Sequence, residues 1–187
     1  MSAKDFIKYS IVRDKGNVIW NLKRILRAAD PKVSKYWKES DEHYSNLDVR
    51  GKKVLVIGAD FGVTPMYFLS KGAQSVVGYS LWKQYFFHPN YEHRQEPFYV
   101  DKLDGEDFDV MSSDCEGCEY GFTKELLNRI GSHVICFHEP VLNGDILEYA
   151  RRMATRLIPP PPFDPSPPSQ GHPGQWKPEV LITEVIR

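Results

Sequence analysis

The clearest pattern of apolar and polar positions along the chain begins at Val54. The run Val54–Ile57 follows two lysines and is too short for an ordinary helix, so it predicts a buried strand. A glycine-bearing turn at residues 58–62 comes next, followed by an apolar helical run at Met66–Leu69 and a second short strand at Ser75–Leu81. Strand, turn, helix and strand within about 30 residues predict a right-handed βαβ unit, with the turn at the carboxyl end of the first strand.

The remaining apolar runs have strand-like or helix-like spacing. Strands are predicted at Phe98–Val100, Phe108–Ser113, His133–His138 and Glu179–Ile186, and helices at Val33–Glu39, Thr123–Ile130 and Asp145–Leu157. Thr123 and Asp145 are expected to cap the last two helices, because short polar side chains accept hydrogen bonds from the free amides of a first turn. The aromatic segment Trp82–Pro97 predicts a functional loop or short helix, or alternatively a hydrophobic plug beneath a loop.

Composition divides the chain into two parts. Residues 1–50 are polar and aromatic, with apolar positions at helical spacing from Val18 to Leu26, and they predict an N-terminal helical extension. Residues 51–187 carry the pattern of one α/β domain. Within that domain the proline-rich segment 159–178 cannot form a helix or an interior strand, so a stiff surface loop or lid is expected. A ligand for a proline-recognising domain is the alternative.

Charge and cysteine content narrow the functional classes. The 187 residues carry a net charge of −1 with 26% charged residues, which disfavours a general electrostatic nucleic-acid binder. We find neither an apolar run long enough to cross a bilayer nor a signal-peptide pattern, so no membrane partner is expected. Three cysteines do not make a disulfide framework, and a reducing, cytoplasmic setting is expected.

The glycine turn is the first candidate for a ligand site. Gly58 and Gly62 have the spacing G-x-x-x-G, which is neither the dinucleotide fingerprint G-x-G-x-x-G nor a P-loop. Glycine lets a ligand approach the backbone closely, and the free amides at a helix start favour an anionic or polar ligand. The alternative is a turn that only connects a strand to a helix.

An acidic run is the second candidate. The stretch Asp107–Tyr120 places Asp114, Glu116 and Glu119 at the end of a predicted strand. Ligands of open α/β sheets bind at the carboxyl ends of the strands, so these carboxylates are expected near the glycine turn. There they could orient a ligand or take a proton. A solvated acidic turn that caps the following helix is the alternative.

Both runs together resemble class I S-adenosylmethionine (SAM)-dependent methyltransferases, specifically the FkbM-like group. The residues 58–62, GADFG, are similar to the GAN-x-G turn of that group, and residues 112–119, SSDCEGCE, are similar to its K-I-D-x-E-G-x-E run. Upstream, Asp101-Lys102-Leu103 looks like the short L-D-x-L piece of the family. The resemblance covers residues 52–140. Val56 and Ser80 stand where the family has acidic residues, and Ser112 stands where it has lysine.

The resemblance implies a fold and an activity. The fold would be a three-layer α/β sandwich with a mostly parallel, Rossmann-like methyltransferase sheet. The short interval between Leu81 and Asp101 leaves room for a sheet reduced by one strand, and Glu179–Ile186 would be an antiparallel edge or insert. The activity would be transfer of a methyl group from SAM to an oxygen or nitrogen of a small molecule or glycan.

The same resemblance implies roles for single residues. Cofactor contacts are expected along the glycine turn for the methionine part, at the end of the second strand for the ribose, and further downstream for the adenine edge; these residues are Gly58, Ala59, Asp60, Gly62, Tyr79, Ser80 and Asp101. Asp114, Glu116, His138 and Glu139 are expected to face the transferred methyl group and the acceptor.

Two other functions are kept open. A non-catalytic methyltransferase-like module could bind a protein partner through the N-terminal helices or the proline-rich segment, and the lost acidic positions favour it. Alternatively, Cys115 and Cys118 could bind metal or cycle as a disulfide, with Cys136, His133 and His138 as further zinc ligands. The family carries small apolar residues at the two cysteine positions, so packing explains them without a metal, and no metal site is predicted.

Overall fold

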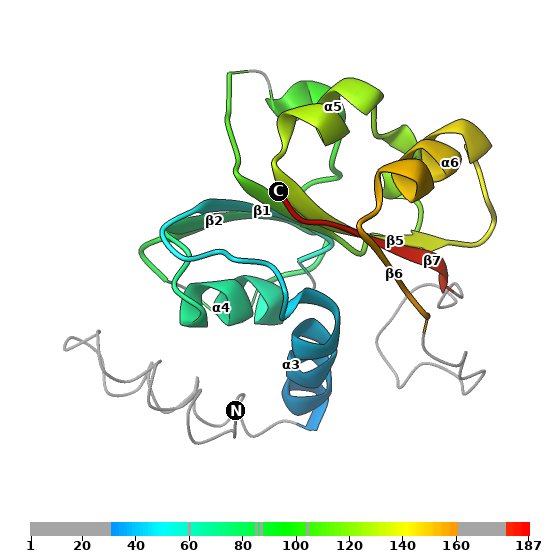
Figure 1. Ribbon diagram of the computed structural model, residues 1–187. Coiled ribbons are helices and arrows are strands. Elements are labelled where there is room, and N and C mark those ends of the chain that lie inside the picture. Colours follow the sequence, from blue (N-terminus) through cyan, green and yellow to red (C-terminus); the bar gives the residue numbers. More distant parts are fainter. Residues whose placement is uncertain (1–30, 60, 85, 87, 104, 161–178) are drawn as a thin grey trace, which may run out of the picture.

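The computed structural model describes residues 31–59, 61–84, 86, 88–103, 105–160 and 179–187 (Figure 1). The predicted helix at Val18–Leu26, the predicted cofactor residue Asp60 and the proline-rich segment from residue 161 onward lie outside these ranges. None of the described helices is both long and apolar enough to cross a lipid bilayer.

A seven-stranded sheet forms the centre of the fold. The strands are β1 (Lys53–Ile57), β2 (Ser75–Tyr79), β3 (Tyr91–Arg94), β4 (Val110–Ser113), β5 (Ser132–His138), β6 (Arg156–Ile158) and β7 (Glu179–Val185). Their order is β3-β2-β1-β4-β5-β7-β6. All pairs among the first five are parallel, whereas β7 pairs antiparallel with both β5 and β6. The predicted mostly parallel sheet is confirmed, and β7 is an antiparallel insert rather than an edge.

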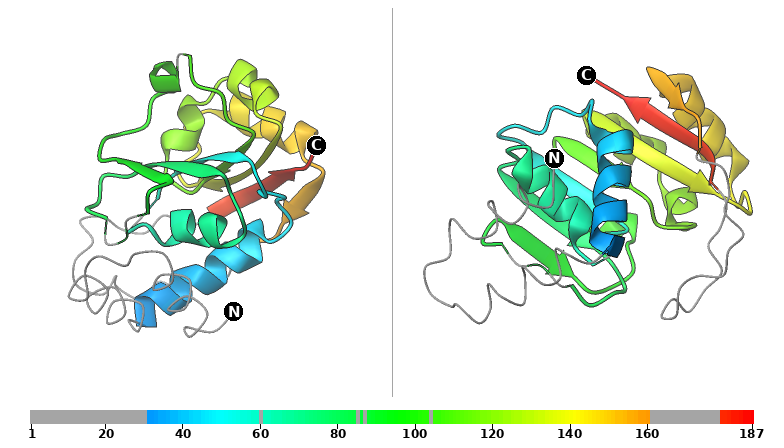
Figure 2. Two further views of the ribbon diagram at one scale, coloured as in Figure 1. Left: turned by 90° about the vertical axis from the view of Figure 1, so that its left-hand side faces the viewer. Right: turned by 90° about the horizontal axis from the view of Figure 1, so that it is seen from below.

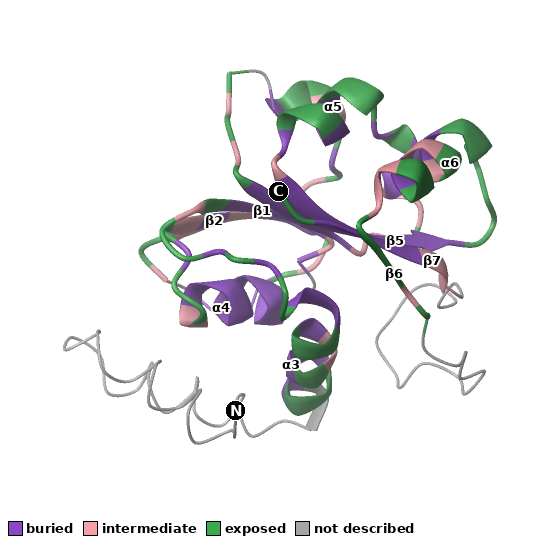
Figure 3. Cartoon of the chain, in the orientation of Figure 1, coloured by how far each residue is buried: buried purple, intermediate pink, exposed green. Residues whose placement is uncertain are grey.

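The strand β1 is buried because both faces of the sheet are covered. Val54 and Val56 belong to the apolar cluster on one face, and Leu55 and Ile57 belong to the cluster on the other. Successive side chains of a strand point to opposite faces, so a doubly covered strand reads as a continuous apolar run. Figure 3 shows this burial through the middle of the sheet.

Helices cover both faces and complete the three layers (Figures 1 and 2). The helices α3 (Pro31–Tyr44) and α4 (Val63–Ser70) lie on one face, and α5 (Lys124–Arg129) and α6 (Gly144–Met153) lie on the other. The ring centroids of Trp37 and Tyr67 are 5.5 Å apart in an edge-to-face contact, which joins α3 to α4. Two short 3-10 helices, η1 (Val100–Leu103) and η2 (Cys118–Gly121), border the carboxyl ends of the parallel strands.

No strand is lost from the sheet, although the short interval after β2 left room for that. The third strand, β3, lies inside the segment Trp82–Pro97, and the described part of the connection from β2 to β3 contains no helix. Among the described residues, the connection between β2 and β3 is therefore short because it contains no crossover helix. The strand predicted at Phe98–Val100 is wrong, since this stretch runs into the 3-10 turn η1 and only Phe98 is buried in it.

The helix predicted at Asp145–Leu157 is also corrected at both ends. It ends at Met153, and the chain continues as the edge strand β6. At its start the N-cap is Asn143, whose Oδ1 accepts hydrogen bonds from the amides of Asp145 at 3.2 Å and Ile146 at 3.4 Å. The N-cap predicted for α5 is confirmed, because Thr123 Oγ1 accepts from the amide of Leu126 at 3.2 Å.

The two candidate caps of α6 can be separated by mutation. Asn143→Ala removes the acceptor of two first-turn amides and is expected to lower the free energy of unfolding by about 1 kcal/mol. Asp145→Ala removes only a favourable charge near the helix start, and we expect a loss of roughly 0.5 kcal/mol or less. Urea unfolding followed by circular dichroism measures both. A larger loss for Asp145→Ala than for Asn143→Ala would contradict the assigned cap.

Candidate functional site

A cavity of about 550 Å³ opens at the carboxyl ends of β1, β2 and β4. Its floor is formed by Gly58 after β1, Tyr79 and Ser80 at the end of β2, and Asp114 after β4. Tyr36 and Glu39 of α3 line it on one side, and the segment 96–100 lines it on another. The site expected at the strand ends is therefore a real cavity, and its size is within the usual range for small-molecule sites.

Gly58 is required by the neighbouring backbone. Its φ is +85°, and a Cβ at this position would lie 1.8 Å from the carbonyl oxygen of Asp114. The amides of Gly58 and Ala59 both donate to the carbonyl oxygen of Tyr79, at 3.0 and 2.9 Å. The glycine therefore lets the ends of β1 and β4 come together. The amides of Gly58 and Ala59 already have an acceptor, so they are not available to a ligand.

Among the other described residues of the glycine turn, Ala59, Phe61 and Gly62 do not line the cavity. Ala59 is fully buried in the core, and the amide of Gly62 donates to the carbonyl oxygen of Ala59 at 2.8 Å. A Cβ on Gly62 would meet the side-chain oxygen of Gln84 at 2.6 Å. The packing of the turn against Gln84 and the core explains why these positions face inward.

Tyr79 and Ser80 at the end of β2 line the cavity, and both of their hydroxyl groups accept hydrogen bonds from the protein. The Tyr79 hydroxyl accepts a hydrogen bond from Arg94 Nη1 at 2.6 Å, and Ser80 Oγ accepts one from the amide of Trp82 at 3.1 Å. Arg94 is held in turn by both carboxylate oxygens of Glu106, at 2.7 and 3.0 Å. No carboxylate follows β2 directly, in agreement with the sequence.

Besides Ala59 and Gly62, the predicted site residues Asp101, His138 and Glu139 do not line the cavity. Asp101 is exposed on η1, because the expected strand there is a 3-10 turn, and the carboxylate that lines this side is Glu96. Glu96 Oε2 accepts from Lys102 Nζ at 2.5 Å. Glu139 is exposed in the turn after β5 and does not line the cavity either. Glu116 is exposed but does line it.

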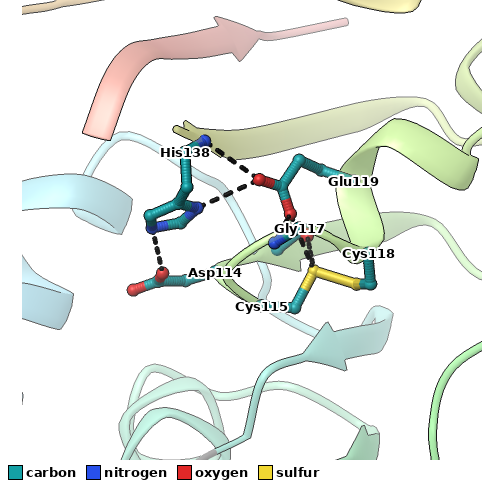
Figure 4. Close-up of a disulfide and its surroundings, with 7 residues drawn as sticks. Asp114, Cys115, Gly117, Cys118, Glu119 and His138 are labelled. Atoms are coloured by element: carbon teal, nitrogen blue, oxygen red, sulfur yellow. Dashed lines mark hydrogen bonds and ion pairs between the residues drawn. A yellow bond between two sulfur atoms is a disulfide. The ribbon is translucent and has the colours of Figure 1, made fainter. Parts of the chain in front are cut away.

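Asp114 and His138 are brought together as part of a buried ionic group. Figure 4 shows the His138 ring between two carboxylates. His138 Nε2 lies 3.2 Å from Asp114 Oδ1, and Nδ1 lies 3.1 Å from Glu119 Oε1. Burial of the ring lowers the pKa of His138, but the hydrogen bonds to Asp114 and Glu119 outweigh this effect and raise the pKa to about 10.

Glu119 is the residue that holds this group in place. It is fully buried, and its Oε1 also accepts from the backbone amide of His138 at 2.9 Å. Its Oε2 accepts from the amide of Gly117 at 2.8 Å. The last acidic residue of the run 112–119 is therefore a structural anchor that fixes His138, and it does not line the cavity.

Cys115 and Cys118 form a disulfide in the wall of the cavity. Cys115 Sγ lies 3.2 Å from Glu119 Oε2 (Figure 4). Because both thiols are consumed, they cannot be the zinc ligands of the alternative hypothesis. The pair remains capable of redox chemistry. Cys136 is a separate, fully buried thiol on β5.

Two further carboxylates near the site were not predicted from the sequence. Glu39 lines the cavity from α3, and Glu179 begins β7 opposite His138 of β5. Burial, followed by the negative charge of Asp114, raises the pKa of each carboxyl to about 7. The sequence showed only that Glu179 begins a predicted strand. It did not show that this strand pairs with β5, so it could not place Glu179 near His138.

Two viral proteins have similar sequences. Uncharacterized protein 158B of Sulfolobus islandicus rod-shaped virus 1 is 30% identical over 115 residues, covering 56% of this chain and 72% of that protein. Uncharacterized protein 65 of Sulfolobus islandicus filamentous virus is 30% identical over 127 residues, covering 63% of this chain and 78% of that protein. No protein-family model matches the chain.

Solved structures identify the fold. The C-terminal domain of precorrin-6Y C5,15-methyltransferase from Rhodobacter capsulatus superposes with a TM-score of 0.57 at 11% identity, covering 82% of this chain and 89% of that chain. A SAM-dependent methyltransferase from Mesorhizobium loti matches with a TM-score of 0.40 at 17% identity, over 57% of this chain and 53% of that one. The chain thus spans about half the length of that enzyme. The first match shows a class I methyltransferase-like fold; the second is too distant to add to it.

Proposed function

The chain belongs to the same family as the two viral proteins, 158B and 65, and we propose that it transfers a methyl group from SAM to an oxygen or nitrogen of a small molecule or glycan. One observation carries the proposal. The cavity lies at the carboxyl ends of β1, β2 and β4, in a sheet with the strand order of a methyltransferase-like fold. The FkbM-like grouping stays a prediction that depends on the runs 58–62 and 112–119.

The size of the cavity and the chemical character of its lining residues are compatible with SAM. The cavity is large enough for a nucleoside-sized ligand, and its lining includes the carboxylate residues Glu39, Glu96 and Asp114 besides aromatic side chains. We assign the ribose to Tyr79 and Ser80, the adenine side to Glu96 and Phe98, and the wall near the reacting methyl group to Asp114. SAM would supply a methyl group already activated by its sulfonium.

The chain itself would mainly align the acceptor. Asp114 is partly exposed at the cavity wall, where its carboxylate can accept a hydrogen bond from an acceptor hydroxyl or amine. His138 fixes Asp114, and Glu119 fixes His138, so the carboxylate is held before any substrate arrives. Such preorganisation is the main requirement when the transferred group needs little further activation.

Calorimetric titration with SAM and with its demethylated product tests the proposal. Micromolar binding to the wild type is expected. Gly121→Trp should weaken it by at least about tenfold. Gly121 lines the cavity, and a Cβ there meets no atom within 4 Å, so the indole has room to occupy ligand space.

Gly144→Trp is the matched control. Gly144 also has open space around its Cβ position, but it lies at the start of α6, away from the cavity. This variant should bind SAM like the wild type. Equal weakening in both variants would mean that the cavity is not the SAM site.

A second function has one observation in its favour. The position after β2 carries Ser80 in place of a carboxylate, and its Oγ already accepts from the amide of Trp82. This arrangement fits a methyltransferase-like module that binds a partner without catalysis. If the folded wild type shows no binding of SAM at millimolar concentration, the result would favour that function.

A further inference from the structure

We propose that Asp114, His138 and Glu179 form a binding site for one divalent metal ion, of which Mn²⁺ is the best match. Each residue offers one ligand atom, and the three atoms lie within 4.8 Å of one another. The proposal concerns metal binding alone, so it does not depend on whether the neighbouring cavity takes SAM.

The sheet brings the three residues to one edge. Asp114 follows β4, His138 is the last residue of β5, and Glu179 is the first residue of β7 and pairs with His138 after a shift in register between Phe137 and His138. The strand β7 is antiparallel, so its beginning meets the carboxyl ends of its neighbours. Three ligands on three adjacent strands are held by backbone hydrogen bonds, which makes the site rigid.

The spacing suits an octahedral ion. Such an ion, bound at about 2.2 Å, holds neighbouring ligand atoms roughly 3 Å apart and opposite ones roughly 4.4 Å apart. His138 Nε2 and Asp114 Oδ1 are 3.2 Å apart, which fits two neighbouring positions. Asp114 also lines the cavity, so an ion bound at this site would lie beside it.

His138 is oriented as a metal-binding histidine usually is. Its Nδ1 faces the fully buried Glu119, which leaves Nε2 directed toward Asp114 (Figure 4). Metal-bound histidines commonly donate their other ring N–H to a carboxylate, which fixes the ring. Glu119 is in turn held by the amide of Gly117, so the ring keeps this orientation when an ion replaces the proton on Nε2.

Glu179 gives an independent reason to expect a cation. Its Oε2 is buried and has no hydrogen-bond partner among the described residues. His138 lies beside Asp114 and Glu119, whereas no described lysine or arginine forms an ion pair with Glu179. A buried, unpaired carboxylate oxygen is unfavourable, and a metal ion bound between these residues would satisfy it.

The donor set indicates the kind of ion. Two carboxylates and one imidazole combine the oxygen ligands preferred by Mg²⁺ and Mn²⁺ with a nitrogen that suits transition metals, so Mn²⁺ matches both. Structural zinc sites favour four closed ligands, often thiolates. The other grouping, Cys115, Cys118 and Glu119, is excluded because its two sulfurs are joined in the disulfide.

Titration of the full chain with Mn²⁺ tests the site directly. The electron paramagnetic resonance signal of free Mn²⁺ should fall as the protein binds it, with one ion per chain at micromolar affinity. Glu179→Gln removes one ligand whose Oε2 makes no hydrogen bond, so the fold should persist, and the affinity should drop by at least about tenfold.

Glu139→Gln is the matched control. It removes the same charge next to His138, but Glu139 is exposed and is not one of the three ligands. Its Mn²⁺ affinity should stay within about twofold of the wild type, because an exposed charge is largely screened. The proposal is overturned if the wild type leaves the Mn²⁺ signal unchanged at millimolar ion, or if a folded Glu179→Gln binds as tightly as the wild type.

Discussion

Gly58→Ala is expected to lower the free energy of unfolding by roughly 3–4 kcal/mol. The added Cβ would lie 1.8 Å from the carbonyl oxygen of Asp114 and 2.5 Å from its carbonyl carbon. Both are backbone atoms, so they cannot rotate away, and β1 must separate from the end of β4. The φ of +85° adds the strain of a left-handed conformation. In a chain of this size the thermal midpoint should fall by roughly 10 °C.

Gly51→Ala is the control for this substitution. Gly51 precedes β1 and also has a positive φ, +71°, but its Cβ position meets no atom within 4 Å. Only the conformational strain should remain, a loss of about 1 kcal/mol. Thermal unfolding followed by circular dichroism compares the two variants. If both variants lose the same free energy of unfolding, the expected clash between the added Cβ and the Asp114 carbonyl group does not lower stability.

The second large effect concerns acid stability and His133. This residue is fully buried on β5, and burial, with a smaller contribution from the charge of Arg187, lowers its pKa from 6.5 to about 4. Between pH 6.5 and 4 the unfolded chain therefore takes up a proton that the folded chain does not. The free energy of unfolding should fall over this interval by up to roughly 3 kcal/mol from His133 alone. Above pH 6.5 the residue should have no effect.

Replacement of His133 by leucine isolates this contribution. Leucine does not titrate, so the difference in stability between His133→Leu and the wild type should grow in favour of the variant as the pH falls from 6.5 to 4. Carboxyl groups titrate in the same interval, but they do so in both proteins and cancel in the difference. Urea unfolding at four or five pH values gives the measurement. A difference that stays constant with pH would show that His133 has the same pKa in the folded and the unfolded chain.

The first strand, turn and helix of the sheet could be predicted because the residues that define them are close together in the sequence. The run Val54–Ile57 is buried on both faces, and the turn and helix after it are close in sequence. The strand β3 escaped prediction because Tyr91–Arg94 is a polar edge strand, with no residue fully buried. The strand β6 is only three residues long, also at an edge, and two of its residues are exposed. Edge strands pack on few neighbours and therefore carry little apolar signal.

The candidate site was predictable only in part, for a similar reason. Asp114 and Glu116 were placed near the cavity because strand ends meet at one edge of a parallel sheet. The contact of His138 with Glu119 and its pairing with Glu179 join residues that are 19 and 41 positions apart. Such contacts depend on which strands become neighbours, and the insertion of β7 beside β5 leaves no mark in the local pattern of the sequence.

The position of β7 also imposes an order on the biosynthesis of the protein. This strand is translated after β5 and β6, yet it lies between them. While the ribosome is still making the preceding segment, the open edge of β5 has no partner of its own, and an unpaired edge is where nascent chains associate wrongly. The edge of the sheet near His138 would then be completed only after β7 has been synthesised, which is later than the synthesis of β1 to β6.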